Sequence, residues 1–331
     1  MRVYIIAEAG VNHNGSVKLA KELCLAAKNA GADCVKFQTW VTEKIITKSV
    51  AQAEYQQENT GIEQSQYDML KHLELTYDEF RQIKEYCDLI GIEFASTADE
   101  ADSLDFLVDL GIPFIKVGSG DMRNISYLRY IGSKGLPIIL STGMSTIGDI
   151  NVSVQALKDG GAKDIKILHC TTNYPCPYDS VNLKAMDTIN KKFNVEVGYS
   201  DHTAGIEVPI AAVARGANII EKHLTLSRNL EGPDHNASME PKEFKIMVDA
   251  IRHIEVALGD GIKKPTVDEI SISKVVLKKI VAARDIPEGK VIVPEDLALK
   301  RNDIGLLADQ WDRVVGSVSN RNYSIDEGID L

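Results

Sequence analysis

Short apolar runs alternate with amphipathic helical stretches from the first residues of the chain to about residue 257. In the helical stretches apolar residues recur every three or four positions, whereas the short runs have the composition of buried strands. The last helical stretch, 241–258, begins with proline, a residue favoured in the first turn of a helix. The eight apolar runs cover residues 3–7, 34–37, 92–95, 114–117, 138–140, 165–168, 195–197 and 218–220.

Eight strands in strict alternation with helices predict an α/β protein built on a (β/α)₈ TIM barrel. A doubly wound open sheet also alternates, but it has fewer strands and a glycine-rich phosphate loop after the first one. Here the first strand is followed by EAGVNHNG at residues 8–15, which is not the GxGxxG pattern. The barrel is therefore the better prediction.

Two segments depart from plain alternation. Residues 40–75 are too many for an ordinary strand-to-helix loop, and connections of that length are usually functional. After residue 261 comes a polar stretch and then a series of short strands and turns. We predict a catalytic barrel over residues 1–262, a linker over 263–278 and a small β-rich domain over 279–331.

The net charge of −11, from 37 basic and 48 acidic residues, argues against a nucleic-acid partner or a membrane-surface role. A locally basic pocket for a small anion is still compatible with it. The five cysteines are an odd number without framework spacing, which suits reduced thiols. No signal peptide or apolar run of about 20 residues is evident, so we expect a cytoplasmic protein.

Polar residues stand at the C-terminal end of every predicted strand, where TIM barrels build their active sites. A purely structural barrel has no need of them. They are Glu8, Lys36, Gln38, Ser96, Thr97, Lys116, Ser119, Ser141, Thr142, His169, Thr172, Tyr174, Ser200, Asp201, His202, Glu221, Lys222 and His223, with Asp234 one loop further on.

His202 and His223 end neighbouring strands, so both imidazoles can reach one metal ion. Glu8, Glu221 or Asp234 could add an oxygen ligand. Such a set suits Mn²⁺, Fe²⁺, Co²⁺ or Zn²⁺, and the lack of thiolate ligands argues against a structural zinc. The alternative is that each histidine only makes a hydrogen bond at a polar strand end.

Lys116 and three serines, Ser119, Ser141 and Ser200, make a second constellation. Small residues flank them in Gly118-Ser119-Gly120 and Ser141-Thr142-Gly143, so backbone N–H groups and hydroxyls can surround an anion while lysine supplies the charge. The alternative for each serine is a helix cap. We predict a phosphate or carboxylate site.

In combination these motifs resemble the sialic acid synthase family, whose members make N-acetylneuraminate or N,N′-diacetyllegionaminate. The resemblance covers essentially the whole chain in order, and the tail looks like the family's antifreeze-like (SAF) domain. The segments that carry it are AEAGVNHNGS (7–16), KFQ (36–38), KVGSG (116–120), STGM (141–144), LHCT (168–171), YP (174–175), GYSDHT (198–203), IEKH (220–223) and GPDH (232–235).

The resemblance implies condensation of phosphoenolpyruvate with a 2-acetamido mannose-type sugar, N-acetylmannosamine or a 2,4-diacetamido-2,4,6-trideoxymannose, with release of phosphate. It implies a divalent metal, Mn²⁺ first and Mg²⁺ or Co²⁺ as alternatives, and a domain-swapped homodimer. It assigns the metal to His202 and His223. Catalytic roles fall to Glu8, Asp121, Glu221 and His223, and substrate binding to Lys36, Gln38, Asn59, Lys116, Ser119, Ser141, Thr172, Tyr174, Ser200, Asp234 and Arg301, the last in the partner subunit's site.

Three positions depart from the family pattern. The family often has Ser-Thr-Pro-Phe after the third strand, whereas this chain ends the same four positions with Asp99. Asp121 stands where a glutamate is common, and Asn302-Asp303 replaces Pro-Gly after Arg301. The reach of the carboxylate at 121 and the loop that aims Arg301 are therefore in question.

Two rival functions remain open. A metal-dependent pyruvate aldolase would use Lys116 as its Schiff-base residue and release no phosphate. A carbohydrate-binding or scaffold protein would keep the barrel without the chemistry, although the complete set of polar strand ends speaks against it.

Overall fold

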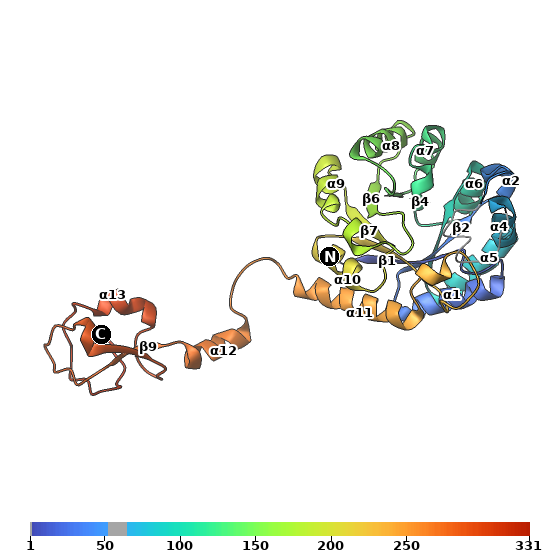
Figure 1. The fold of residues 1–331 in the computed structure, drawn as a ribbon. Coiled ribbons are helices and arrows are strands. Elements are labelled where there is room, and N and C mark those ends of the chain that lie inside the picture. The colour runs from blue at the N-terminus through green and yellow to red at the C-terminus, as the bar shows by residue number, and fades with distance from the viewer. Residues whose placement is uncertain (1, 52–64) are drawn as a thin grey trace. The chain divides into compact units, whose positions relative to one another are not determined.

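The computed structural model describes residues 2–51 and 65–331, which form two compact units, Met1–Gly259 and Asp260–Leu331. In the first unit eight parallel strands close into a barrel, with β1 paired to both β2 and β8, and helices surround it (Figure 1). The predicted (β/α)₈ barrel is thereby confirmed. The strands are β1 Tyr4–Gly10, β2 Cys34–Thr39, β3 Glu93–Ala98, β4 Ile115–Val117, β5 Ile138–Ser141, β6 Ile165–Cys170, β7 Val197–Asp201 and β8 Ile219–His223.

One principal helix follows each strand, and each begins and ends on local signals in the sequence. Helix α5, for example, starts with a capping box between Thr76 and Glu79 and ends at Gly91, whose φ of 72° suits glycine. The helices are α1 Val17–Ala30, α5 Tyr77–Ile90, α6 Ala101–Leu110, α7 Ile125–Gly132, α8 Ile147–Asp159, α9 Ala185–Phe193, α10 Glu207–Ala214 and α11 Pro241–Ala257.

The long connection after β2 is partly helical. It contains α2 (Thr42–Ile45) and α4 (Gln66–Leu73), whose buried Met69 and Leu73 form a small apolar cluster with Val11 and Trp40. This cluster packs α4 against residues that follow β1 and β2. Residues 52–64, which include Asn59, lie outside the described residues.

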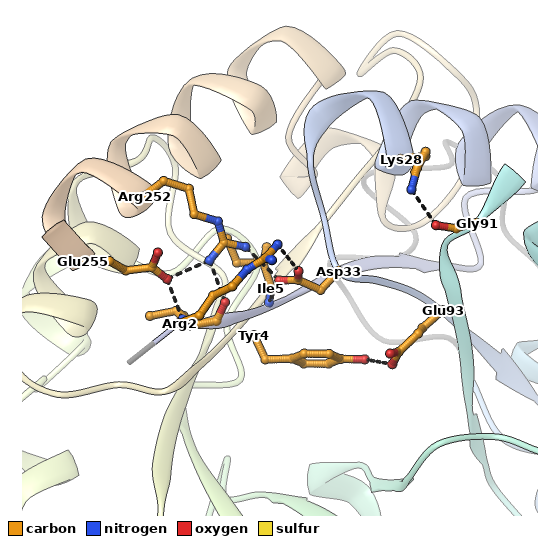
Figure 2. A network of polar contacts seen from close by, with 10 residues as sticks. Arg2, Tyr4, Ile5, Lys28, Asp33, Gly91, Glu93, Arg252 and Glu255 are labelled. Carbon is orange, nitrogen blue, oxygen red and sulfur yellow. Dashed lines mark hydrogen bonds and ion pairs between the residues drawn. The ribbon is translucent and has the colours of Figure 1, made fainter.

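At the N-terminal end of the barrel, a polar network joins the last helix to the first strand (Figure 2). The Arg252 guanidinium on α11 donates to the Val3 carbonyl oxygen at 2.7 Å and pairs with Asp33 at 2.8 Å. Asp33 in turn accepts from the Ile5 N–H at 2.9 Å. Because α11 follows the eighth strand, these contacts fasten the end of the barrel sequence to its beginning.

The second unit has its own apolar core, which includes Ile280, Ile292, Leu297 and Tyr323. Its two-stranded antiparallel sheet pairs β9 (Lys279–Ala282) with β10 (Leu297–Lys300), and a short helix α13 (Trp311–Val314) follows. The expected small β-rich domain is confirmed. The stretch predicted as a linker contains helix α12 (Val267–Val276), which starts with a capping box between Thr266 and Glu269 and buries none of its residues.

Candidate active site

The inside of the barrel changes from apolar to polar between two successive layers of side chains. One layer is a closed apolar cluster of Ile6, Cys34, Ala95, Phe114, Ile139, Leu168 and Ile219. Side chains two positions apart on a strand face the same side, so the next layer toward the strand C-termini faces inward as well. That layer is Glu8, Lys36, Thr97, Lys116, Ser141, Cys170 and Glu221. The apolar cluster therefore forms the floor of a polar site.

A cavity of about 210 Å³ opens above this floor at the C-terminal ends of the strands. Its size suits small substrates. Its walls are Glu8, Lys36, Gln38, Thr97, Asp99, Lys116, Gly118, Ser119, Gly120, Ser141, Met144, Cys170, Thr172, Tyr174, Ser200, His202, Glu221 and His223.

Two lysines and two glutamates form a buried ion network in the cavity. Lys36 Nζ lies 2.5 Å from Glu8 Oε2 and 3.7 Å from Glu221 Oε2. Lys116 Nζ lies 3.3 Å from Glu221 Oε1, which also accepts a hydrogen bond from Ser200 Oγ at 3.0 Å. The network is close to neutral when both glutamates are ionised, and protonation of Glu8 gives it a net positive charge.

The two glutamates differ in proton affinity because they face different neighbours. Burial raises the pKa of Glu8, and the charge of Lys36 only partly opposes this effect. Burial also acts on Glu221, but Lys116 and Lys36 outweigh it and hold the pKa of Glu221 below its usual range. The site therefore holds one carboxyl poised to exchange a proton and one that stays charged.

Small residues give the serine side of the cavity its shape. The Gly143 N–H donates to Ser119 Oγ at 3.0 Å. A Cβ at Gly143 would lie 2.0 Å from Thr172 Oγ1 and 2.7 Å from Ser119 Oγ, so only glycine lets these hydroxyls approach. Ser141 Oγ is buried with no hydrogen-bond partner among the described residues. This wall therefore offers hydroxyl groups to an anion near Lys116.

His202 and His223 face each other with ring centroids 5.5 Å apart, and the Tyr174 ring lies 4.2 Å from that of His202. His202 Nδ1 donates to the Thr171 carbonyl oxygen at 2.8 Å, which leaves a lone pair on Nε2. His223 Nδ1 is buried without a hydrogen-bond partner among the described residues. Burial, helped by the neighbouring His202, lowers the pKa of His223 well below its ordinary value. Burial lowers the pKa of His202 too, but its contacts with the Cys170 thiol and the Thr171 carbonyl outweigh burial and raise it. His223 is therefore the ring that stays neutral and free to bind through nitrogen.

The histidine pair fits a divalent metal. An ion about 2 Å from one nitrogen of each ring would lie about 3.2 Å from each centroid, so rings 5.5 Å apart are within reach of one ion. Across the described part of the chain, no three His, Cys, Asp or Glu side chains are grouped as a full ligand set. The pair therefore supplies two nitrogen ligands, one fewer than the three protein ligands of typical catalytic zinc sites.

The structure brings together most of the predicted site residues. Gln38 Nε2 donates to Glu8 Oε1 at 3.3 Å, and Thr172 and Tyr174 line the cavity, the latter before a cis peptide bond to Pro175. Asp234 lies at the edge of the site, where its Oδ2 is 3.9 Å from His223 Nδ1. Burial raises the pKa of Asp234 to about 6.

Besides Asp234, two described residues that were predicted for the site, Asp121 and Arg301, are not among the cavity walls. Asp121 lies on the short helix η1 (Ser119–Asp121), half-buried, where its Oδ1 accepts a hydrogen bond from Asn124 at 3.1 Å. Arg301 is exposed directly after β10, in the second unit. Asn59 lies outside the described residues.

Asp99 and Cys170 are among the cavity residues that were not predicted as site residues. Asp99 was noted only as a departure from the family pattern, yet its place directly after a barrel strand was a usable signal. Cys170 has no obvious base beside it in the sequence, but the structure places its Sγ 3.9 Å from His202 Nδ1. That proximity arises from the pairing of β6 with β7, which the sequence does not display.

Comparison with known proteins decides the family. Residues 23–263 match the model of the NeuB family, and residues 279–330 match the SAF domain. The chain belongs to the NeuB family. N,N′-diacetyllegionaminic acid synthase of Legionella pneumophila is 45% identical over 328 residues, which cover 98% of this chain and 92% of the relative. N-acetylneuraminate-9-phosphate synthase of Homo sapiens is 35% identical over 298 residues, covering 90% and 82% of the two chains.

A solved structure is similar in fold as well. The N-acetylneuraminic acid synthetase of Leptospira borgpetersenii, in complex with citrate, is 34% identical with a TM-score of 0.73 and covers 83% of this chain and 93% of that one. The predicted resemblance to sialic acid synthases is therefore confirmed, and so is the prediction of an enzyme, a transferase of this family. Among the described residues, none of the helices is long and apolar enough to cross a bilayer.

Proposed function

We propose that this enzyme condenses phosphoenolpyruvate with an open-chain 2-acetamido mannose-type sugar, giving a nine-carbon 2-keto acid and phosphate. The observation that carries the proposal is one cavity in a NeuB-family barrel that combines two buried lysines, a wall of hydroxyl groups and a facing pair of imidazoles. The lysines and the hydroxyl wall can hold an anion. The imidazole pair can hold a metal ion that activates an aldehyde.

Phosphoenolpyruvate would bind against Lys116 with Ser119, Ser141 and Ser200. Two features support this placement. Ser141 Oγ is buried without a partner among the described residues, and Glu221 neutralises Lys116 only in part, at 3.3 Å. A trianionic ligand would use both the charge and the free hydroxyl.

The two glutamates would act on the reacting carbons. Positive charge develops at C2 of phosphoenolpyruvate once its C3 has attacked the aldehyde carbon, and the charged Glu221 is suited to stabilise it. Glu8, with its raised pKa, is suited to take the proton from the water that adds at C2. Gln38 would orient Glu8 through their 3.3 Å hydrogen bond.

His202 and His223 would hold the divalent metal, with Mn²⁺ the first choice and Mg²⁺ or Co²⁺ as alternatives. When bound, such an ion supplies Lewis acidity to the sugar aldehyde. Asp234 and Tyr174, beside the two rings, would contact the sugar, together with Thr172, Lys36 and Asn59. Arg301 would contact the N-acetyl group in the partner subunit's site of a domain-swapped homodimer.

Of the two candidate sugars, we favour the 2,4-diacetamido-2,4,6-trideoxymannose. The legionaminic acid synthase of Legionella is 45% identical to this chain, whereas the human N-acetylneuraminate-9-phosphate synthase is 35% identical. N-acetylmannosamine remains the second candidate, because the Leptospira protein at 34% identity is an N-acetylneuraminic acid synthetase.

Phosphate release with each sugar, phosphoenolpyruvate and Mn²⁺ tests the proposal. We expect one phosphate per keto acid, only when all three are present, and a higher kcat/KM with the diacetamido sugar. A higher kcat/KM with N-acetylmannosamine would reverse the choice of sugar. Borohydride trapping of pyruvate on Lys116, without phosphate release, would instead establish the aldolase. Metal-dependent turnover that survives in a His202→Ala/His223→Ala variant would overturn the metal assignment.

A further inference from the structure

Asp99 follows directly after β3, and hydrogen bonds hold the backbone on both sides of it. Its N–H donates to the Thr39 carbonyl oxygen at 3.2 Å. The Tyr127 hydroxyl on α7 lies 2.8 Å from the Ala98 carbonyl oxygen and 3.2 Å from that of Glu100. These three contacts fix the backbone at Asp99, whose side chain is among those that line the cavity.

The Asp99 carboxyl lines the cavity, but it makes no hydrogen bond or ion pair with any described residue. It shares this part of the wall with Gly118, Ser119 and Gly120 from the neighbouring strand end, and these belong to the anion-binding side. A carboxyl group held at a fixed place, open to the cavity and without a partner, is available to a ligand.

Charged groups face Asp99 from every adjoining element. Asp121 on η1 and Glu8 on β1 are negative, Glu100 is next in the chain, and Lys36 on β2 is positive; the Tyr127 hydroxyl is neutral. Burial, followed by the charge of Asp121, raises the pKa of Asp99 to about 7. An anion bound beside this carboxyl would repel its charged form and draw a proton onto it.

We propose that Asp99 is a further catalytic residue of the reaction proposed above, whose protonated carboxyl gives its proton to the phosphate oxygen that leaves C2. As the C2–O bond breaks, the bonding electron pair stays on that oxygen, which takes the Asp99 proton. The hydroxyl that water added at C2 then gives its proton to the Asp99 carboxylate and becomes the keto group. The proton that Glu8 took from the water passes to the oxygen of the former aldehyde, which becomes a hydroxyl. One hydrogenphosphate leaves and both Asp99 and Glu8 return to their starting states, so protons and electrons balance.

Proton uptake on phosphoenolpyruvate binding tests this step apart from turnover. Calorimetric titrations of the metal-loaded full chain at pH 7.5, in buffers that differ in ionisation enthalpy, give the number of protons taken up. A group with a pKa of about 7 is about three-quarters ionised at that pH. We expect Asp99→Asn to reduce the uptake by up to about three-quarters of a proton, and Asp109→Asn, at an exposed position on α6, to leave it unchanged.

Kinetics give a second readout. We expect Asp99→Asn to lower kcat about 100-fold or more without raising the KM for phosphoenolpyruvate, and Asp99→Glu to recover part of the loss. A merely structural defect would raise the KM for phosphoenolpyruvate, and Asp99→Glu would then not recover kcat. Unchanged proton uptake, or a kcat within twofold of the wild type, would overturn the inference alone. Failure of the wild-type protein to bind phosphoenolpyruvate would overturn the proposed function and this step with it.

Discussion

At the scale of single residues, buried charges in this barrel are held in pairs. Lys36 faces Glu8 and Lys116 faces Glu221 within the cavity. An isolated buried charge costs several kcal/mol, so each member of a pair depends on the other. A substitution that removes one charge therefore leaves the other uncompensated. The resulting loss in free energy of unfolding exceeds the net contribution of the ion pair.

A pair behind the site allows this cost to be measured apart from catalysis. Lys222 Nζ lies 2.5 Å from Asp201 Oδ2 and donates to the Thr203 carbonyl oxygen at 2.5 Å, with both charged side chains almost fully buried. We expect Lys222→Met to lower the free energy of unfolding by about 3–5 kcal/mol in urea titrations, because Asp201 stays buried and unpaired.

The exposed Lys242→Met on α11 is the control, with an expected change below about 0.5 kcal/mol. A second substitution, Asp201→Asn in the Lys222→Met background, should recover part of the loss, since it removes the unpaired charge. A Lys222→Met cost below about 1 kcal/mol would contradict the expectation.

Asp99 carries a prediction about stability and pH. Its pKa rises from 3.8 to about 7 on folding, so the folded state binds more protons between these pH values and stability falls as pH rises through them. Asp99→Asn removes that loss. We expect the free energy of unfolding of the variant, from urea titrations, to exceed that of the wild type by up to about 4 kcal/mol at pH 8 and to be similar near pH 4. Equal stability at pH 8 would contradict the raised pKa.

At the scale of elements, the strands reach further than their apolar runs. Runs 195–197 and 218–220 predicted two short strands, but β7 is Val197–Asp201 and β8 is Ile219–His223. The pairing continues because neighbouring strands supply backbone partners, as in the register of Ser200 with Glu221, and side-chain partners neutralise the charges. Hydrophobicity alone places the end of a strand too early wherever the site begins.

Helix α11 offers a test of how the barrel is fastened. Arg252 contacts the Val3 carbonyl oxygen and Asp33, near the start of the chain. We expect Arg252→Ala to lower the free energy of unfolding by about 1–3 kcal/mol, because partly buried acceptors lose a charged donor. Lys245→Ala, which removes an exposed pair with Asp249 on the same helix, should cost less than about 0.5 kcal/mol. If urea titrations show that Arg252→Ala and Lys245→Ala lower the free energy of unfolding equally, the network does not fasten the helix.

At the scale of the whole molecule, the proposed domain-swapped dimer predicts complementation between two inactive variants. If each site takes His202 from one subunit and Arg301 from the other, a mixed dimer of His202→Ala and Arg301→Ala has one intact site. We expect random subunit exchange to restore about a quarter of the wild-type sites. Activity of the mixture, measured as phosphate release, checks this.

The control replaces the Arg301→Ala chain with a His202→Ala/Arg301→Ala chain, which leaves every site without its histidine. This mixture should stay inactive. No recovery in the first mixture, although exchange is verified with differently tagged chains, would mean that Arg301 does not act on the partner's site.

The sequence alone was sufficient for the barrel and for most of the cavity. Alternating strand and helix patterns determine a closed barrel, and the closed barrel brings all strand ends to one face, so residues such as Lys116 and Glu221 were predictable without knowing any distance. Local signals also place helix ends, as at Thr76 and Gly91. These features depend on periodicity and local chemistry, which a sequence displays directly.

The tertiary structure decided which side chains face one another. It opened Asp99 to the cavity and placed Asp121 away from its walls, although both follow strand ends. It also gave Glu8 and Glu221 opposite pKa shifts. These outcomes depend on side-chain direction, burial and the distance between charges from different strands, and such quantities exist only once the barrel has closed.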